Sequence, residues 1–354
     1  MRGVEPVDPE DIYDHYAEQL RIEGKSERTV RQLRTVESKF ETFLEQEGIS
    51  VNEVGVQEVK RFINKEKQSV TDESVLGYVR ALNSMVDYYC NRGYFDANPV
   101  KIAMDETEWN VDNRKHRKEL SLKQLRSGIQ SETRPVTFTE LILLAKTGAR
   151  AAEVSNLDWA DIHITHPLSD RLFPEPRGEI QDYPDTLFID STISEGDEVR
   201  GEVRTSGNKR KVDSKIPIDN ELKDTLVWWK AMQPPSKSPA NPILTQDGGG
   251  GKSSLGERLS SESVSSRATM WARERGWNPK GTGIEQSISS HWFRHFFTTH
   301  MTRRIDPDDI EGNSPREIVK FYRGDVGEDI IDRYTHHWGN YTRSAYLNNI
   351  YKLL

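Results

Sequence analysis

The sequence has a single cysteine, Cys90, among 354 residues. One thiol excludes an internal disulfide framework and any structural zinc site built on several thiolates. No apolar run approaches the roughly 20 residues that a membrane helix needs, so we expect no membrane span. The first residues, MRGVEPVDPEDIYDHY, lack a basic segment followed by an apolar one. This favours a cytoplasmic protein over an exported one.

Positive charge is also in deficit. The chain has 49 Lys and Arg against 57 Asp and Glu, a formal net charge of −8. This balance argues mildly against a nucleic-acid partner, because phosphate binding needs concentrated positive charge. Binding depends on local patches, however. A DNA-binding protein adapted to high internal salt, with basic residues kept at its contact face, is a hypothesis that fits the same numbers.

The length predicts two domains, or one large domain with an appendage. The first of these has the pattern of a helical bundle. Apolar residues recur at helical spacing in four segments: Ile12–Leu20, Val30–Leu44, Val56–Ile63 and Val75–Tyr89. The Asn98-Pro99 pair is expected to end helix formation. We therefore predict a four-helix bundle over residues 1–105.

A polar stretch without apolar periodicity, residues 106–120, is predicted to be a linker. It contains the basic residues Arg114, Lys115 and Arg117, which would cross the DNA backbone if the two domains clamp a duplex. A flexible charged linker is the simpler alternative. Residues 121–354 form the second domain, which is mostly helical, with strands between about residues 186 and 218. The predicted fold class is mainly α with a small β-sheet or hairpin.

Four segments of the second domain carry the residues for metal-free phosphodiester chemistry: TGARAAEV, GNKRK, HWFRHFFTTHM and RYTHHWGNY. Attack on a phosphodiester adds negative charge to its non-bridging oxygens. Two guanidiniums suit this state because each is planar, permanently cationic and able to donate two parallel N–H groups. Arg150 and Arg294 would form such a clamp from distant parts of the chain.

The remaining chemistry needs a nucleophile and a proton donor. Tyrosine is a weak nucleophile, with an unperturbed pKa of about 10, and needs cations and a base nearby. The leaving deoxyribose oxygen needs a proton, which a lysine on a mobile turn can deliver. His291 lies one helical turn before Arg294, so it can reach the same phosphate or act in proton transfer.

These segments resemble the catalytic domain of the tyrosine recombinases, the phage integrase family. TGARAAEVSNLDWADI resembles the first arginine box and HWFRHFFTTHM the second, while the hairpin closing at IPID and the tail DRYTHH also fit. The front bundle resembles that family's core-binding domain. The acidic composition is compatible with an archaeal or salt-adapted member.

The resemblance implies a site-specific recombinase that cleaves one DNA strand, holds a 3′-phosphotyrosine link and rejoins the strand without metal or cofactor. It also implies several protomers, as in a tetramer, assembled on double-stranded recombination sites, and therefore a protein located with the nucleoid. A type IB topoisomerase, or a non-catalytic DNA-binding protein with a decayed site, are the alternative functions.

The resemblance assigns Arg150, His291 and Arg294 to the catalytic site, and Glu153 to bracing Arg150. A surface pair between residues three apart is the alternative for Glu153. The family's lysine lies at a set interval before the hairpin's closing proline, which points to Lys209.

Lys211 lies on the same turn as Lys209 and could substitute for it. The alternative for either lysine is a solvated basic hairpin tip.

The nucleophile has three candidates, Tyr334, Tyr341 and Tyr346, and the resemblance favours Tyr334 because of its DRYTH setting. Nine positions earlier, where the family usually has histidine or tryptophan, this chain has Asp325. A carboxylate beside a phosphate would repel it. We therefore expect Asp325 to face away, or to be protonated or neutralised by Arg323.

The DNA-contacting residues are predicted from helical faces. In the second helix, Arg28, Arg31 and Thr35 lie opposite the apolar stripe, and Arg80 has the comparable position in the fourth helix. The resemblance implies that such helices enter the major groove, and an ordinary solvated face is the alternative.

Two features of the C-terminal third have competing interpretations. The spacing of His291, His295 and His300 could suit a metal, but HExxH is absent, so we expect no metal site and assign His295 and His300 to packing or support. The C-terminal segment has an apolar face that could dock on a neighbouring protomer or pack on its own domain: Leu347, Ile350, Tyr351 and Leu354.

Overall fold

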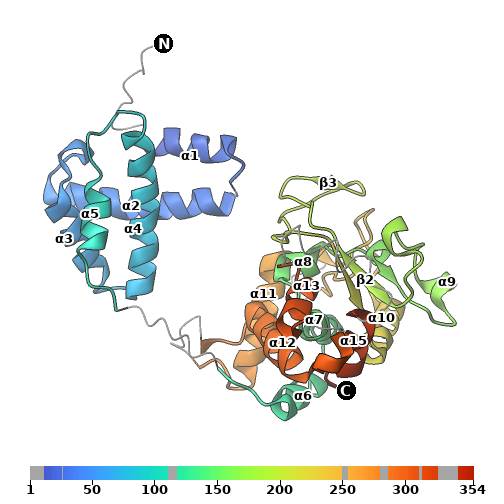
Figure 1. Cartoon of the computed structure of the whole chain (residues 1–354). Coiled ribbons are helices and arrows are strands. Elements are labelled where there is room, and N and C mark those ends of the chain that lie inside the picture. Colours follow the sequence, from blue (N-terminus) through green and yellow to red (C-terminus); the bar gives the residue numbers. More distant parts are fainter. Residues whose placement is uncertain are drawn as a thin grey trace. The chain divides into compact units, whose positions relative to one another are not determined.

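The structure is a computed structural model that describes residues 12–25, 27–110, 118–248, 254–279, 286–310, 313–325 and 342–354. The chain divides into two compact units, Met1–Lys115 and His116–Leu354 (Figure 1). Each unit has its own hydrophobic core. The boundary falls within the segment predicted as a linker. The basic cluster Arg114, Lys115 and Arg117 lies outside the described residues.

The N-terminal unit is helical. Its elements are α1 (Ile12–Ile22), α2 (Glu27–Glu47), the 3-10 turn η2 (Val51–Glu53), α3 (Val56–Glu66), α4 (Asp72–Cys90) and α5 (Pro99–Asp105). The first four α-helices follow the four predicted apolar segments, whose stripes form the core because amphipathic helices bury their apolar faces against one another.

The Asn98-Pro99 pair begins a helix, so the prediction that it ends helix formation is wrong. The Asn98 side chain accepts a hydrogen bond from the Lys101 backbone N–H at 3.0 Å. Pro99 occupies the first turn of α5, where a backbone donor has no intrahelical partner. The short helix then adds Val100 and Ala103 to the core.

The C-terminal unit is built around α7, which is buried along nearly its whole length and packs against α10, α11 and α12 (Figure 1). Its α-helices are α6 (Leu122–Gln130), α7 (Pro135–Thr147), α8 (Ala151–Asn156), α9 (Ser169–Leu172), α10 (Asn220–Met232), α11 (Ser261–Glu274), α12 (Ser290–Arg304), α13 (Pro315–Tyr322) and α15 (Arg343–Asn349). The 3-10 turns are η3 (Trp159–Asp161), η4 (Gly178–Ile180) and η7 (Pro307–Ile310).

The strands are few and short. An antiparallel sheet has the order β1 (Ile162–His163), β2 (Thr186–Ile189), β5 (Ser214–Pro217), and a separate hairpin pairs β3 (Glu198–Val199) with β4 (Glu202–Val203). All four residues of β2 are buried, and Leu187 pairs with both Ile162 and Ile216. The predicted class, mainly helical with a small sheet, is confirmed.

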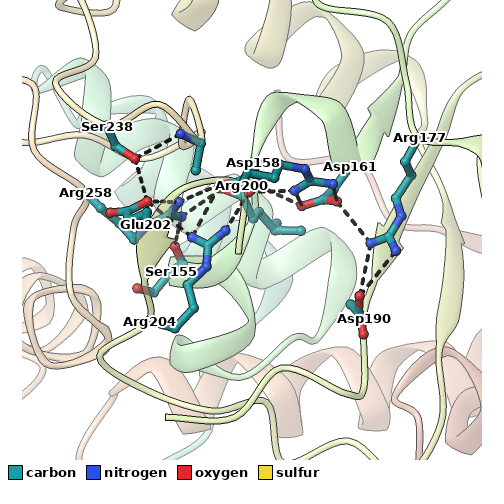
Figure 2. A network of polar contacts seen from close by, with 12 residues as sticks. Ser155, Asp158, Asp161, Arg177, Asp190, Arg200, Glu202, Arg204, Ser238 and Arg258 are labelled. Atoms are coloured by element: carbon teal, nitrogen blue, oxygen red, sulfur yellow. Dashed lines mark hydrogen bonds and ion pairs between the residues drawn. The ribbon is translucent and has the colours of Figure 1, made fainter. Parts of the chain in front are cut away.

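A buried ion-pair network fixes the β3–β4 hairpin (Figure 2). The carboxylate of Asp158, which is fully buried, lies 2.6 Å from Arg200, 2.6 Å from Arg204 and 2.5 Å from Arg258. Glu202 of β4 also pairs with Arg258, at 2.6 Å. These ion pairs attach the hairpin to the segment that follows α8. They therefore restrict the part of the chain between β2 and Lys209.

Within the part of the chain that the structure describes, no helix is both long and apolar enough to cross a membrane.

Candidate active site

Arg150 is placed by a sharp break between α7 and α8. Gly148 ends α7 with φ +60°, and a Cβ there would lie 2.5 Å from Cδ1 of Phe297. Only glycine fits this left-handed position and close approach. The helical path is thus interrupted at Gly148, and Arg150 becomes the N-cap residue of α8.

Glu153 holds Arg150 at two points. Its Oε2 accepts the Arg150 backbone N–H at 2.8 Å, and its Oε1 accepts the Arg150 Nη1–H at 2.8 Å. The Glu153 side chain is fully buried, so the pair is not the exposed surface pair that was the alternative interpretation. This geometry leaves Nη2 of Arg150 available to another acceptor.

Arg294 comes from α12, and its side chain is only 1% exposed. Its Nη1 donates to the Gly148 carbonyl at 2.8 Å and its Nη2 to the Arg323 carbonyl at 3.0 Å. Nη2 of Arg294 and Nη2 of Arg150 both donate to the same atom, Oδ1 of Asp325, at 2.9 Å each. Two guanidiniums from distant parts of the sequence thus converge on one anionic oxygen.

Asp325 therefore faces the two arginines, and the expectation that it faces away is wrong. Its Oδ2 also lies 2.6 Å from Nη2 of Arg323, the neutralising partner considered from the sequence. Burial alone would raise the pKa of Asp325, but Arg294, Arg323 and Arg150 lower it below its ordinary value. The carboxyl is thus ionised at neutral pH, which excludes the protonated alternative.

A fourth guanidinium, Arg210, completes the cluster. Its side chain is buried, its Nη2 donates to Oε2 of Glu153 at 3.1 Å, and its Nη1 donates to the Tyr322 carbonyl at 2.9 Å. Gly324 permits this contact, because a Cβ there would lie 2.2 Å from Cγ of Arg210. Burial would raise the pKa of Glu153, but Arg210 and then Arg294 lower it to about 2.

Sequence reasoning did not assign Arg210 to the site, because only the two lysines of the basic run GNKRK were considered there. Lys209 and Lys211, its neighbours in that run, are exposed, and the Lys211 backbone N–H donates to the Gly324 carbonyl at 3.1 Å. The segment carrying both lysines thus lies beside residues 322–325. Neither lysine is at the tip of the β3–β4 hairpin, which ends at Val203.

His291 lies in the first turn of α12 and is exposed, with its Nε2 2.9 Å from Nε2 of His295. His300 packs its ring against Phe296 and Tyr351, with centroid distances of 4.0 and 5.7 Å. Among the described residues, no group of three or more His, Cys, Asp or Glu side chains could hold a metal ion.

Of the three tyrosine candidates, Tyr346 lies among the described residues. Tyr334 and Tyr341 lie outside the described residues. Tyr346 is fully buried and its hydroxyl donates to the Lys146 carbonyl at 2.7 Å. Burial raises the pKa of Tyr346 well above the ordinary value, so this phenol is both inaccessible and hard to ionise.

Comparison with known proteins places this geometry in a known fold. The family model for the phage integrase SAM-like domain matches residues 11–108. The structure is similar to a lambda integrase dimer bound to a COC′ core site, with a TM-score of 0.59 and 15% identity, over 91% of this chain and 96% of that one. The chain has the lambda integrase fold.

The Tn1549 transposon integrase in complex with a circular intermediate DNA is similar as well, with a TM-score of 0.58 and 14% identity, over 92% of this chain and 99% of that one. A search of curated proteins gave no match. The resemblance to the tyrosine recombinases is thus confirmed for the front domain and for the fold.

The residues of the apolar C-terminal face are partly buried and partly exposed. Ile350 and Tyr351 are buried in their own domain, and the Tyr351 hydroxyl donates to the Ala145 carbonyl. Leu347 and Leu354 remain 37% and 45% exposed. Packing on its own domain therefore accounts for part of that face.

The candidate DNA-contacting residues lie on two helices of the N-terminal unit. Arg31 and Thr35 are exposed on α2, and Arg80 is exposed on α4, while the side chain of Arg28 is outside what the structure describes. Neither Arg31 nor Arg80 forms an ion pair with another described residue, whereas the neighbouring Arg34 pairs with Glu37 at 2.8 Å.

Proposed function

We propose that the protein is a site-specific DNA recombinase that breaks and rejoins strands through a 3′-phosphotyrosine intermediate. The observation that carries the proposal is the convergence of Arg150 and Arg294 on one oxygen of Asp325. A carboxylate oxygen and a non-bridging phosphate oxygen are both anionic acceptors for guanidinium N–H groups. The same two donors can therefore stabilise the charge that develops on a phosphate under attack.

The proposed reaction uses groups of this chain alone. The Tyr334 hydroxyl attacks the scissile phosphorus, its proton passes to a nearby base such as His291, and the bond to the 5′ oxygen breaks. Lys209 gives that oxygen its proton, with Lys211 as the substitute. A 5′-hydroxyl from a partner strand then attacks the phosphotyrosine and gives its proton to the neutral Lys209. The bond to the Tyr334 oxygen breaks, that oxygen regains its proton from the same base, and the phosphodiester energy is retained.

The DNA partner and the assembly are part of the proposal. A lambda integrase tetramer bound to a Holliday junction has a TM-score of 0.58 to this chain at 16% identity. That likeness supports assembly of several copies on paired duplex sites. In this arrangement Arg31 and Arg80, with Arg28 and Thr35, contact DNA from the front domain, and the basic linker residues cross the backbone.

Covalent trapping tests the proposal. A cognate site is selected from a random duplex pool, and a suicide substrate carrying it is nicked next to the cleavage position. We expect a covalent protein–DNA adduct that Tyr334→Phe abolishes and Tyr341→Phe retains. Arg150→Gln and Arg294→Gln should each slow adduct formation by about 100-fold or more, because each removes a donor to the developing charge.

The outcomes separate the alternatives. If Tyr341→Phe abolishes the adduct and Tyr334→Phe does not, the nucleophile assignment is wrong and the class of enzyme stands. Specific binding without any adduct would instead indicate the non-catalytic DNA-binding protein. Relaxation of supercoiled DNA without exchange between two sites would indicate a type IB topoisomerase activity.

A further inference from the structure

We propose that the Asp325 carboxylate occupies the position of the scissile phosphate in the DNA-free protein, and that Arg323 is a third guanidinium that binds this phosphate once Asp325 has been displaced. The inference deepens the proposed function, on which the identity of the natural ligand as a DNA phosphate rests. Three arginines define the position: Arg150 and Arg294 donate to Oδ1 of Asp325, and Arg323 contacts Oδ2.

The carboxylate is a fair stand-in for a phosphate because both present anionic oxygens in a fork that suits guanidinium N–H groups. The contacts of Asp325 span 2.6 to 2.9 Å and come from residues before α8, in α12 and after α13. In a simple exposed ion pair, a carboxylate would contact one guanidinium. Here three chain segments are arranged around one anion position.

The cluster holds more positive charge than its own acids neutralise. Four guanidiniums, from Arg150, Arg210, Arg294 and Arg323, face the carboxylates of Glu153 and Asp325. The Nε atoms of three of these arginines are buried without a hydrogen-bond partner among the described residues: Arg210, Arg294 and Arg323. Among the described residues, both the positive charge and the N–H donors of this cluster exceed the acidic and acceptor groups that face it.

The excess of positive charge also affects the pKa of the Arg294 guanidinium. Burial, together with repulsion from Arg323 and Arg150, lowers the pKa of Arg294 to about 10, although Glu153 and Asp325 oppose this shift. An added anion would stabilise the charged guanidinium. Removal of Asp325 without a replacement would leave the arginines facing one another.

Arg323 is held so that its guanidinium can serve a ligand. Its Nη1 donates to the Thr298 hydroxyl at 3.1 Å, and its carbonyl accepts from Arg294. Its side chain remains 20% exposed, and that of Asp325 remains 25% exposed. Both groups can thus be reached from solvent, and rotation of the Asp325 side chain would open the position without moving the arginines.

Displacement has a measurable consequence. A ligand whose site is occupied by a group of the protein binds with an apparent affinity reduced by the fraction of time that the site is open. Asp325→Asn removes the charge of the occupant and keeps its size. This variant should bind inorganic phosphate at least about ten-fold more tightly than the natural chain, since the neutral amide competes weakly for three guanidiniums.

Calorimetric titration of the full chain with inorganic phosphate, at constant ionic strength set with KCl, tests this. Asp190→Asn is the matched control, because Asp190 pairs with Arg177 at 3.2 Å and its side chain is 19% exposed. Its phosphate affinity should equal that of the natural chain. If Asp325→Asn gains no more than this control, the proposal is wrong.

The role of Arg323 is tested in the Asp325→Asn background. Adding Arg323→Gln should lower phosphate affinity by about ten-fold, whereas adding Arg177→Gln should leave it unchanged. Equal affinities in the two double variants would remove Arg323 from the phosphate site. If Asp325→Asn does not fold in chloride, phosphate should restore its fold. If phosphate does not restore it, and Asp325→Ser shows no gain in phosphate affinity over the natural chain, the proposal is wrong.

These results are independent of the tyrosine chemistry. Tight phosphate binding by Asp325→Asn without any covalent adduct on DNA would uphold the phosphate site and contradict the proposed recombinase. If the natural chain forms the covalent adduct on DNA but Asp325→Asn gains no phosphate affinity, the proposed recombinase is upheld and the phosphate site is contradicted.

Discussion

Glu153 is the residue on which the arginine cluster depends most. Its fully buried carboxylate bonds Arg150 and Arg210 and lies 3.9 Å from Nη1 of Arg294. Removing one partner of a buried ion pair leaves uncompensated charge. Glu153→Gln should therefore lower the free energy of unfolding at pH 7 by about 3 kcal/mol. Urea denaturation followed by tryptophan fluorescence measures this, because every tryptophan except Trp109 lies in the C-terminal unit.

The same carboxyl predicts a pH dependence. Its pKa in the folded chain is about 2, below its ordinary 4.5. A group whose pKa is lowered by folding adds stability that is fully present above its unfolded pKa and is lost as the pH falls through its folded pKa. Stability of the natural chain should fall between about pH 4.5 and pH 2, and the Glu153→Gln curve should be flatter there.

Glu179 provides the control for the unfolding free energy at pH 7. Its pKa is also lowered to about 2, through a hydrogen bond from Arg177, but its side chain is 49% exposed. Solvent screens such a pair, so Glu179→Gln should cost less than about 1 kcal/mol. Equal losses in the Glu179 and Glu153 variants would contradict the central place of Glu153.

Sequence reasoning could find the arginine clamp and could not find its surroundings. Arg150 and Glu153 are three residues apart, so local geometry alone pairs them. Arg210 lies in the basic run GNKRK, where only the lysines were considered, and it is buried because Glu153 and the Tyr322 carbonyl accept its hydrogen bonds. Arg323 is held by Thr298 of α12 as well as by Asp325. The orientation of Asp325 depends on the same partners. A buried charge is decided by tertiary contacts, which a short motif does not encode.

At the scale of elements, the β3–β4 hairpin depends on Asp158. Three arginines, Arg200, Arg204 and Arg258, share this one buried carboxylate. Asp158→Asn should release the hairpin, so amide hydrogen exchange over residues 196–208 should become at least about ten-fold faster, since each 1.4 kcal/mol of local stability is one factor of ten. Mass spectrometry of peptic fragments measures this.

The control for the hairpin is a nearby acid with less burial. Asp190 contacts Arg177 and is 19% exposed, so Asp190→Asn should change exchange in residues 196–208 by much less. Unchanged exchange in Asp158→Asn would mean that the hairpin's backbone hydrogen bonds hold it without the ion pairs.

Helix α2 allows a second test at this scale, because it carries matched arginines. Arg31 has no ion-pair partner among the described residues, while Arg34 bonds Glu37 and Asp14. Each phosphate contact contributes about 0.9 to the slope of log affinity against log salt. Arg31→Gln should reduce that slope by about 0.9 for a duplex of unrelated sequence, as should Arg80→Gln. Arg34→Gln should leave it unchanged, and an equal effect would contradict the assignment of the α2 face.

Elements were predictable in proportion to their length and periodicity. The four long helices of the front domain repeat apolar residues over several turns, which fixes their position. Helix α5 has seven residues and β1 has two, too few to show a period. The interruption before Arg150 depends on the contact of Gly148 with Phe297 of α12, which no local pattern reveals.

For the whole molecule, the formal net charge of −8 must be reconciled with DNA as the proposed partner. The excess acidic charge repels DNA, and this repulsion is weakened by salt. Salt also weakens the attraction of the cationic contacts, so the two effects oppose each other. A chain whose cationic contacts are accompanied by a net negative charge should therefore show a shallower net dependence on salt than a basic protein with the same contacts.

The full chain on its selected site should show this shallow dependence. Its affinity should fall by less than the roughly 10³ to 10⁵ that six to ten phosphate contacts cost an ordinary DNA-binding protein between 50 and 200 mM salt. Fluorescence anisotropy of a labelled duplex measures the affinity at each salt concentration. A 1,000-fold loss, as an order of magnitude, would mean that many phosphate contacts dominate and that the acidic exterior offers no adaptation to salt.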